Sequence, residues 1–374
     1  MNVNRLLKIQ EEDALNTFRR FLAVWWDQVK LDALFTPVEQ PDQVGVSLKV
    51  LSNPKELELV NPFAPIMLIN SAAAVKSFIN EHSGERLAVI LRPCELRTLV
   101  ELYKRQRIAT HTQFGSGEER RGWHPPEVTL IGVDCPGTFS VEEYSRCVVS
   151  LGIENLVRET LAYRSEDNPL PGKLRLACTL CDSPAPLGAD IVIGTLGAAP
   201  RGYLLVIASD EATDQRLQLE ASTDAIAEEE QVIHREFAIH AITKGHAARQ
   251  RALTVNGELL QPDSTSAPNL FSLLGLFANC TLCADCLDAC PLYDGELEGM
   301  LGVNRARQSS RPLLSELVGV SRWLVSCSGC GMCQEACDHS VTFAPLISSI
   351  SHRLRSELHY TAGDPFQHLP WELA

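Results

Sequence analysis

The chain has 374 residues, enough for two or three domains with a hydrophobic core that needs no disulfide bonds. Its composition, 45% hydrophobic and 21% charged residues, is ordinary for a globular protein. The formal net charge of -14 argues against nucleic acid as a partner, because most of the surface repels a phosphate backbone.

The N-terminal sequence contains no apolar segment after a basic start, and no apolar run approaches the length of a membrane span. We therefore expect neither an export signal of its own nor a transmembrane segment, and predict a cytoplasmic protein. Thirteen cysteines in such a compartment indicate metal or redox chemistry, because the cytosol keeps thiols reduced.

The first predicted element is an amphipathic helix over residues 11–32, with apolar residues at three-to-four spacing. These include Leu15, Phe18, Leu22 and Trp25. Short apolar runs then predict strands that end at residues 91, 133, 194 and 209, and helical patterns cover residues 96–103, 140–161 and 224–251. This alternation predicts an α/β core with a largely parallel or mixed sheet.

Residues 259–269 are polar, contain two prolines and form a predicted linker. The expected division is an N-terminal helical and α/β segment of the core over 1–84, an α/β core over 85–258, and a helical ferredoxin-like domain with a tail over 270–374.

Eight cysteines behind this linker form two C-x2-C-x2-C-x3-C runs, the spacing of two-cluster bacterial ferredoxins. In such runs three thiolates hold one 4Fe-4S cluster and the fourth holds the other cluster. The expected first set is Cys280, Cys283, Cys286 and Cys337, and the second is Cys327, Cys330, Cys333 and Cys290. Zinc, the alternative, favours two separated pairs over this repeated spacing.

Four further cysteines carry a second prediction: Cys94 and Cys135 each follow a predicted strand, and Cys178 and Cys181 form a C-x2-C loop before another. Parallel strands direct such residues to one edge of the sheet, where ligands collect. The four thiols would complete a third cluster there, although spacing alone leaves this open. Cys147 lies within a predicted helix and is interpreted as a buried hydrophobic residue.

Three segments, "ILRPCELRTLVELYK", "IGVDCPGTFS" and "CTLCDSPAPLGADIVIGTLG", resemble the core motifs of the coenzyme F420 hydrogenase and dehydrogenase beta subunit family. The order of core and ferredoxin runs, and the ending "HYTAGDPFQHLPWEL", are most similar to the formate dehydrogenase beta subunits of that family. The resemblance implies that Cys94, Cys135, Cys178 and Cys181 bind a 4Fe-4S cluster beside an FAD. The family's N-terminal glycine-rich segment has no clear match.

No G-x-G-x-x-G fingerprint follows a strand, so we expect no ordinary Rossmann nucleotide site. Candidate flavin contacts are arginines that suit a pyrophosphate and loop residues that permit close backbone approach. They are Arg92, Glu95, Arg97, Gly137, Thr138, Gly194, Thr195 and Gly197. No residue is predicted to be catalytic.

The leading functional hypothesis is an oxidoreductase subunit that is active only with its partner. It would pass electrons between the catalytic alpha subunit of a formate dehydrogenase or hydrogenase and a two-electron carrier, coenzyme F420 or a nicotinamide. A soluble carrier or a ferredoxin is a further possible partner. The alternatives are a non-catalytic electron relay in a complex of heterodisulfide reductase or hydrogenase type, and a zinc-stabilised interaction protein.

Overall fold

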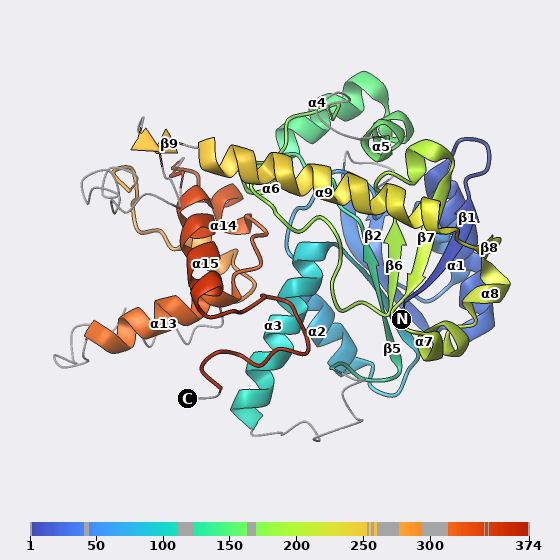
Figure 1. Ribbon diagram of the computed structural model, residues 1–374, viewed down its shortest axis with the longest axis horizontal. Helices are drawn as coiled ribbons and strands as arrows, with labels where there is room; N and C mark the ends of the chain where they lie inside the picture. The colour runs from blue at the N-terminus through green and yellow to red at the C-terminus, as the bar shows by residue number, and fades with distance from the viewer. Residues whose placement is uncertain are drawn as a thin grey trace.

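A computed structural model of the chain describes residues 2–40, 45–110, 123–162, 170–252, 254–255, 258–259, 277–293, 313–339, 341–342 and 344–372. Figure 1 shows two parts, a sheet flanked by helices and a smaller helical part formed by the C-terminal residues. The predicted linker falls outside the described residues except for Leu259.

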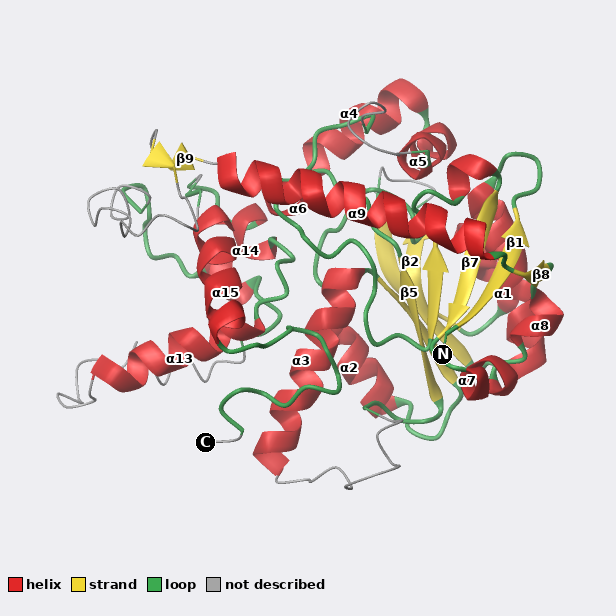
Figure 2. Ribbon diagram, in the orientation of Figure 1, coloured by secondary structure: helices red, strands yellow, loops and turns green. Residues whose placement is uncertain are grey.

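An eight-stranded mixed sheet forms the centre of the first part, in the order β3-β2-β4-β5-β6-β7-β1-β8 (Figure 2). Strands β2, β4, β5 and β6 are parallel, whereas β1, β3, β7 and β8 join the sheet through antiparallel pairs. The strands are β1 (Val3–Lys8), β2 (Ala33–Glu39), β3 (Val46–Leu51), β4 (Leu87–Leu91), β5 (Val128–Val133), β6 (Ile191–Gly194), β7 (Tyr203–Ala208) and β8 (Ala225–Ile226). The predicted α/β core with a largely parallel or mixed sheet is thus confirmed, as a mixed sheet.

Helices cover both faces of this sheet, which explains why its central strands are apolar throughout. The helices of this part are α1 (Ala14–Val29), α2 (Ala72–Glu81), α3 (Pro93–Thr110), α4 (Val141–Leu151), α5 (Ile153–Leu161), α6 (Leu176–Thr179), α7 (Glu211–Arg216), α8 (Leu219–Ser222) and α9 (Glu229–Ala252), with short 3-10 turns at Pro54–Leu59 and Ala199–Arg201. A separate two-stranded ribbon joins β9 (Thr254–Val255) to β10 (Glu258–Leu259).

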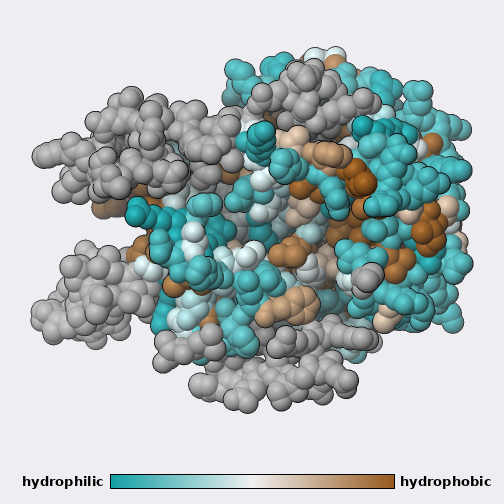
Figure 3. All heavy atoms as spheres, in the orientation of Figure 1, coloured by the Kyte–Doolittle hydropathy of each residue, from teal (hydrophilic) through white to brown (hydrophobic). Residues whose placement is uncertain are grey.

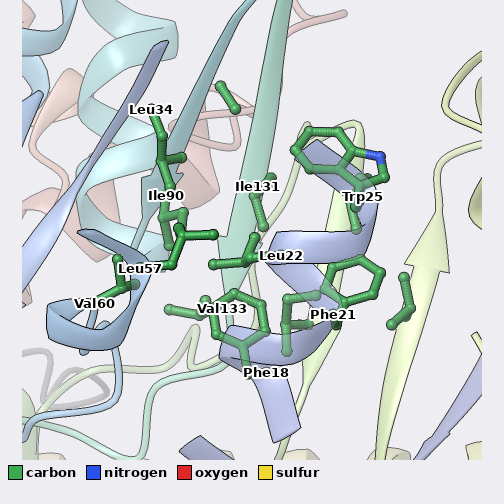
Figure 4. Close-up of a cluster of buried hydrophobic side chains, with 14 of the residues drawn as sticks. Phe18, Phe21, Leu22, Trp25, Leu34, Leu57, Val60, Ile90, Ile131 and Val133 are labelled. Atoms are coloured by element: carbon green, nitrogen blue, oxygen red, sulfur yellow. The ribbon is translucent and has the colours of Figure 1, made fainter. Parts of the chain in front are cut away.

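The aromatic face of α1 packs on one side of the sheet, as its periodicity predicts. Phe18, Leu22 and Trp25 are at most 1% exposed and lie against Ile131 and Val133 of β5 (Figure 4). The other side of β5 presents Val128 and Leu130 to a second cluster built from α2 and α3. Alternate residues of one strand therefore serve two cores.

The helical pattern over residues 140–161 divides into α4 and α5. Gly152 separates them with a φ of 77°, in the left-handed region that favours glycine. Cys147 on α4 is 1% exposed within an apolar cluster, which confirms its interpretation as a buried residue.

The C-terminal part consists of α11 (Asp285–Asp288), α13 (Leu313–Ser326), α14 (Met332–Glu335) and α15 (Ala344–Glu357). Its tail packs on α3 of the first part through buried polar contacts. The Tyr360 hydroxyl lies 2.6 Å from Glu101 Oε1, Lys104 Nζ lies 2.8 Å from the same hydroxyl, and the amide of Gly363 donates to Glu101 over 2.9 Å. Arg105 also donates to the carbonyl oxygen of Leu292 over 3.1 Å. The two parts are thus joined at α3.

Within the described residues, no helix is both long and apolar enough to cross a membrane. The face that carries α9 is mainly hydrophilic, and its hydrophobic residues form separate patches (Figure 3).

Candidate iron-sulfur centres

The four cysteines of the first part meet in one cavity. Cys94 lies in the first turn of α3, directly after β4, and Cys135 follows β5, the parallel neighbour of β4. Cys178 on α6 and Cys181 beside it line the same cavity as Cys94 and Cys135. The carboxyl ends of parallel strands meet at one edge of a sheet, so the fold gathers thiols that are 87 residues apart along the chain (181 minus 94).

Two backbone hydrogen bonds hold the loop with Cys178 and Cys181 over this edge. The amide of Cys135 donates to the carbonyl of Pro184 over 2.9 Å, and the amide of Arg175 donates to Thr138 over 2.9 Å. The Thr138 amide and hydroxyl lie 3.4 and 3.3 Å from Cys178 Sγ. These contacts hold Cys178 and Cys181 at the same edge of the sheet as Cys94 and Cys135.

The pKa shifts of these thiols reflect their burial and their mutual proximity. Burial raises the pKa of Cys94 well above its ordinary value, and nearby Glu95, Cys330 and Cys135 raise it further. Burial also raises the pKa of Cys135, with contributions from Cys178 and Cys181, although Arg92 opposes the shift. Four neighbouring thiolates require a bound metal centre to offset their mutual repulsion.

Three buried guanidinium groups each lie against one of these thiols. Arg92 Nη1 is 3.5 Å from Cys135 Sγ, Arg97 Nη2 is 3.9 Å from Cys181 Sγ, and Arg175 Nη2 is 3.6 Å from Cys178 Sγ. Among the described residues, the buried Arg97 Nε and Arg175 Nη1 have no hydrogen-bond partner. A buried N–H group without an acceptor is costly, so the cavity suits an anionic group such as a thiolate-bound iron-sulfur cluster.

The first set of C-terminal cysteines gathers around Cys286. Burial raises the pKa of this thiol first, and then Cys283, Cys337 and Cys280 raise it as near neighbours. Cys280 and Cys283 are exposed, and Cys337 is half-buried. The thiol of Cys337, from the second sequence run, therefore lies with three thiols of the first run.

The second set of C-terminal cysteines gathers around Cys333 and includes one thiol from the first run. Burial raises the pKa of Cys333, followed by the neighbouring thiols of Cys330, Cys327 and Cys290. Burial likewise raises the pKa of Cys327 to about 11, with Cys330 and Cys290 among its neighbours. Cys290, from the first run, thus lies with three thiols of the second run, the arrangement that the ferredoxin spacing predicts.

Both runs adopt the same backbone turn. Leu282 and Ala284 in the first run have φ values of 59° and 73°, and the matching Gly329 and Gly331 in the second have 71° and 73°. Left-handed residues in such turns direct successive backbone N–H groups into a concavity that suits anions, iron-sulfur clusters among them. Leucine and alanine adopt this conformation only at a cost, whereas glycine adopts it freely.

Cys330 links the C-terminal part to the core site. It lines the cavity that holds Cys94, Cys135, Cys178 and Cys181, and it belongs to the second C-terminal set. Cys286 of the first set is in turn a near neighbour of Cys333. The three thiol groups thus form a series, with the set around Cys330 in the middle.

Among the described residues, no three histidine, cysteine or acidic side chains approach closely enough to coordinate one shared metal ion. A four-iron cluster binds its four thiolates through separate iron atoms and therefore accepts a wider spacing than a single ion does.

The predicted flavin contacts divide into two groups. Arg92, Arg97, Gly137 and Thr138 line the cysteine cavity, and Glu95 accepts a hydrogen bond from the Arg92 amide over 3.0 Å beside it. They therefore surround the proposed cluster itself.

Gly194, Thr195 and Gly197 lie elsewhere, under α9. A Cβ on Gly197 would come within 2.4 Å of the His234 carbonyl oxygen, and one on Gly194 within 2.7 Å of Arg235. The Thr195 amide donates to Asp134, which pairs with Arg235 over 2.6 Å. These residues serve the packing of α9 on the sheet, and their contact with a flavin stays a prediction.

Sequence reasoning missed two side chains at the thiol sites, Arg175 and Trp323. Arg175 precedes Cys178 by three residues, a spacing that places them on the same side of a helical turn, so this signal was available. Trp323 donates to Cys290 Sγ over 3.3 Å from α13, 33 residues away, and no local pattern indicates that contact.

A groove of about 660 Å³ lies between the core and the C-terminal part and reaches Cys290. Leu68, Ile69 and Val141 in its wall are about half exposed, although they are large and apolar. Its charged lining consists of Arg175 with Glu142, Asp288 and Glu335. Its volume is in the range of small-molecule sites.

Comparison with known proteins bears on the C-terminal cysteines. The family model of the 4Fe-4S dicluster domain matches residues 277–341, a range that includes all eight C-terminal cysteines. The molecule is therefore an iron-sulfur protein with a mixed α/β core and a C-terminal 4Fe-4S dicluster domain, which supports two 4Fe-4S clusters there.

A curated relative, the F420-dependent formate dehydrogenase subunit beta of Methanocaldococcus jannaschii, is 21% identical over 308 residues, which are 75% of this chain and 74% of the relative. The chain is a distant homologue of that oxidoreductase subunit, and the resemblance predicted from the motifs is confirmed. A chain in the solved F420-reducing [NiFe] hydrogenase complex of Methanosarcina barkeri is 14% identical, with a TM-score of 0.44 over 70% of this chain and 96% of that one.

Proposed function

We propose that the protein is an iron-sulfur flavoprotein subunit that passes electrons between a catalytic partner and a two-electron carrier. The partner would be the alpha subunit of a formate dehydrogenase or hydrogenase, and the carrier coenzyme F420 or a nicotinamide. The distant relationship to a formate dehydrogenase beta subunit supports the first part, and the name of that relative supports F420 as the carrier.

The observation that carries the proposal is the position of Cys330. This residue of the dicluster domain lines the same cavity as the four core cysteines. A third 4Fe-4S cluster held by Cys94, Cys135, Cys178 and Cys181 would therefore lie directly beside the second cluster of the dicluster domain. One-electron centres in such a series give a path between the surface of the dicluster domain and the core.

FAD is the second part of the proposal. A flavin exchanges single electrons with clusters and a hydride with a two-electron carrier, and the protein supplies its orientation. The groove beside Cys290 is the candidate site, because its wall offers Leu68, Ile69 and Val141 as an apolar surface for a ring system.

The proposed division of the chain remains that expected from the sequence: residues 1–84 and 85–258 as the core, 259–269 as a linker and 270–374 as the cluster domain. The dicluster match lies wholly within the last range.

Cofactor analysis after anaerobic purification tests the third cluster. We expect about twelve irons per chain, and about eight in a Cys94→Ser/Cys135→Ser double variant, because one four-iron cluster loses two ligands. Cys147→Ser is the matched control, since this buried thiol lies outside the cavity, and it should keep about twelve. About eight irons in the unmodified protein would contradict the third cluster.

The flavin site is tested separately by extractable FAD. Ile69→Trp should fill part of the groove and remove FAD while the iron content stays unchanged. Val149→Trp is the control, because Val149 is 82% exposed on α4 and does not line the groove. Equal FAD content in both variants would exclude this groove as the flavin site.

A non-catalytic electron relay is the second candidate. The covering of Gly194, Thr195 and Gly197 by α9 favours it, because three of the eight predicted flavin contacts are engaged in helix packing. A relay would contain the clusters, lack FAD, reduce no soluble carrier and still pass electrons to a protein partner.

A further inference from the structure

The three arginines at the core cavity form a cationic shell around its thiols. Arg92 reaches Cys135 from the end of β4, Arg97 reaches Cys181 from α3, and Arg175 reaches Cys178 from the turn before α6, at 3.5 to 3.9 Å. Three separate elements thus direct guanidinium groups at three of the four thiols.

This shell is buried, so water does little to screen it. Arg92, Arg97 and Arg175 are 5 to 6% exposed. The carboxylates near these thiols are Glu95, which is buried, and Asp182 and Glu335, which reach water. Glu95 is already engaged by the Ser71 hydroxyl over 2.7 Å and by the Arg92 amide. The sulfurs of Cys135, Cys178 and Cys181 are therefore each in direct contact with a buried positive charge.

The two C-terminal cysteine runs contribute no cation of their own, although Arg97 lines a cavity together with Cys327 and Cys333. From Cys280 to Pro291 and from Cys327 to Asp338 the sequence contains no lysine or arginine, and it contains Asp285, Asp288, Glu335 and Asp338. Arg355 lies near Cys327 as a cation from another element. Cys280 and Cys283 are exposed to water.

Reduction adds one negative charge to a cluster, so positive charges and N–H donors at its sulfurs stabilise the reduced form and raise the reduction potential. We propose that Arg92, Arg97 and Arg175 give the core cluster the highest reduction potential of the three, so that it draws electrons inward from the dicluster domain. This inference rests on the proposed third cluster. One electron leaves a reduced dicluster centre and enters the oxidised core centre, with no bond or proton changed.

A redox titration followed by electron paramagnetic resonance, with dithionite as the one-electron donor, tests this ordering. The core signal is the one that disappears in Cys94→Ser/Cys135→Ser, and we expect it to have the highest midpoint. Arg175→Gln should lower that midpoint by at least about 59 mV, a tenfold change in the ratio of oxidised to reduced cluster. The midpoint of the middle cluster, whose Cys330 lines the same cavity as Arg175, should move less, and that of the outer cluster should not move.

Arg175→Lys keeps the charge and should recover most of the shift. Arg158→Gln is the surface control: it removes an exposed guanidinium of α5 and should change no midpoint. If Arg175→Gln does not fold, Arg97→Gln tests the same shell from α3. The inference is overturned if the core midpoint is at or below the other two, or if neither variant changes it. Neither outcome contradicts the third cluster. If all signals persist in Cys94→Ser/Cys135→Ser, the third cluster is overturned as well.

Discussion

The indole Nε1 of Trp323 donates a hydrogen bond to Cys290 Sγ over 3.3 Å, although the two residues belong to different elements of the C-terminal part. Cys290 closes the first cysteine run, and Trp323 lies on α13, just before the second run. The contact therefore joins the two runs at the thiol that the second cluster is expected to share.

Trp323→Phe removes this donor and keeps an aromatic ring. Loss of an N–H···S bond should lower the reduction potential of the middle cluster without loss of iron, because such bonds stabilise the reduced form. A redox titration of each cluster signal measures the shift. Trp371→Phe, on the tail beside Arg322, is the control and should leave all midpoints in place. An unchanged middle potential in Trp323→Phe would show that the bond does not tune it.

Exchange of the fourth ligand between runs is tested by pairs of substitutions. Cys283→Ser with Cys337→Ser should affect one cluster and remove about four irons, because both thiols belong to the first set. Cys283→Ser with Cys290→Ser should affect two clusters and remove about eight. Iron analysis of the two double variants separates the models, since the order of losses would reverse if each run kept its own fourth cysteine.

The contact of the tail with α3 should contribute measurably to stability. Tyr360→Phe removes the 2.6 Å hydrogen bond to Glu101, a buried side chain, and should cost about 1–3 kcal/mol. Tyr144→Phe is the matched control, because the hydroxyl of this buried tyrosine has no partner among the described residues. Thermal unfolding at pH 7 measures both. Equal melting temperatures for the two variants would contradict a stabilising role for Tyr360.

Strand β5 shows how far sequence reasoning reaches in this fold. Its bounds match the predicted run at residues 128–133, because a strand covered on both faces is apolar at every position. Strand β1 was not predicted: it contains Arg5, whose partner Asp214 is 209 residues away, so its burial cannot be inferred locally. Strand β2 was not predicted either, because it contains Pro37, and proline disfavours an internal strand.

The parallel part of the sheet was predicted, whereas the antiparallel pairing of β6 with β7 was not, although the sequence carried a signal for it. Only a short turn separates β6 from β7, which excludes a crossover helix and makes the pair antiparallel. At the sites, the cysteine spacing indicated the thiols. Trp323 could not be found, because it reaches its thiol through tertiary packing alone.

Tyr144 also predicts a dependence on alkaline pH. Burial raises the pKa of this phenol to about 12, whereas an exposed tyrosine ionises near 10. Between these values the unfolded chain loses the proton and the folded chain keeps it, so stability falls by up to about 1.4 kcal/mol per pH unit. Tyr144→Phe should be neutral at pH 7 and relatively stabilising at pH 11, as measured by melting temperature. A constant difference at both pH values would contradict the assignment.

Gly197 offers a direct test of whether the loop under α9 serves packing or flavin binding. Gly197 and Gly202 both have left-handed backbones, with φ values of 68° and 84°. A Cβ at Gly202 meets nothing within 4 Å, whereas one at Gly197 would come within 2.4 Å of the His234 carbonyl oxygen. Gly202→Ala should therefore cost about 1–2 kcal/mol for the backbone alone, and Gly197→Ala distinctly more.

The two variants are compared by melting temperature and by FAD content after purification at low temperature. If packing is the role of Gly197, its substitution lowers the melting temperature more than that of Gly202 and leaves the FAD content of the folded protein unchanged. Loss of FAD from folded Gly197→Ala, with Gly202→Ala intact, would instead restore this loop as part of the flavin site, because only a contact with the flavin would couple the added methyl group to its retention.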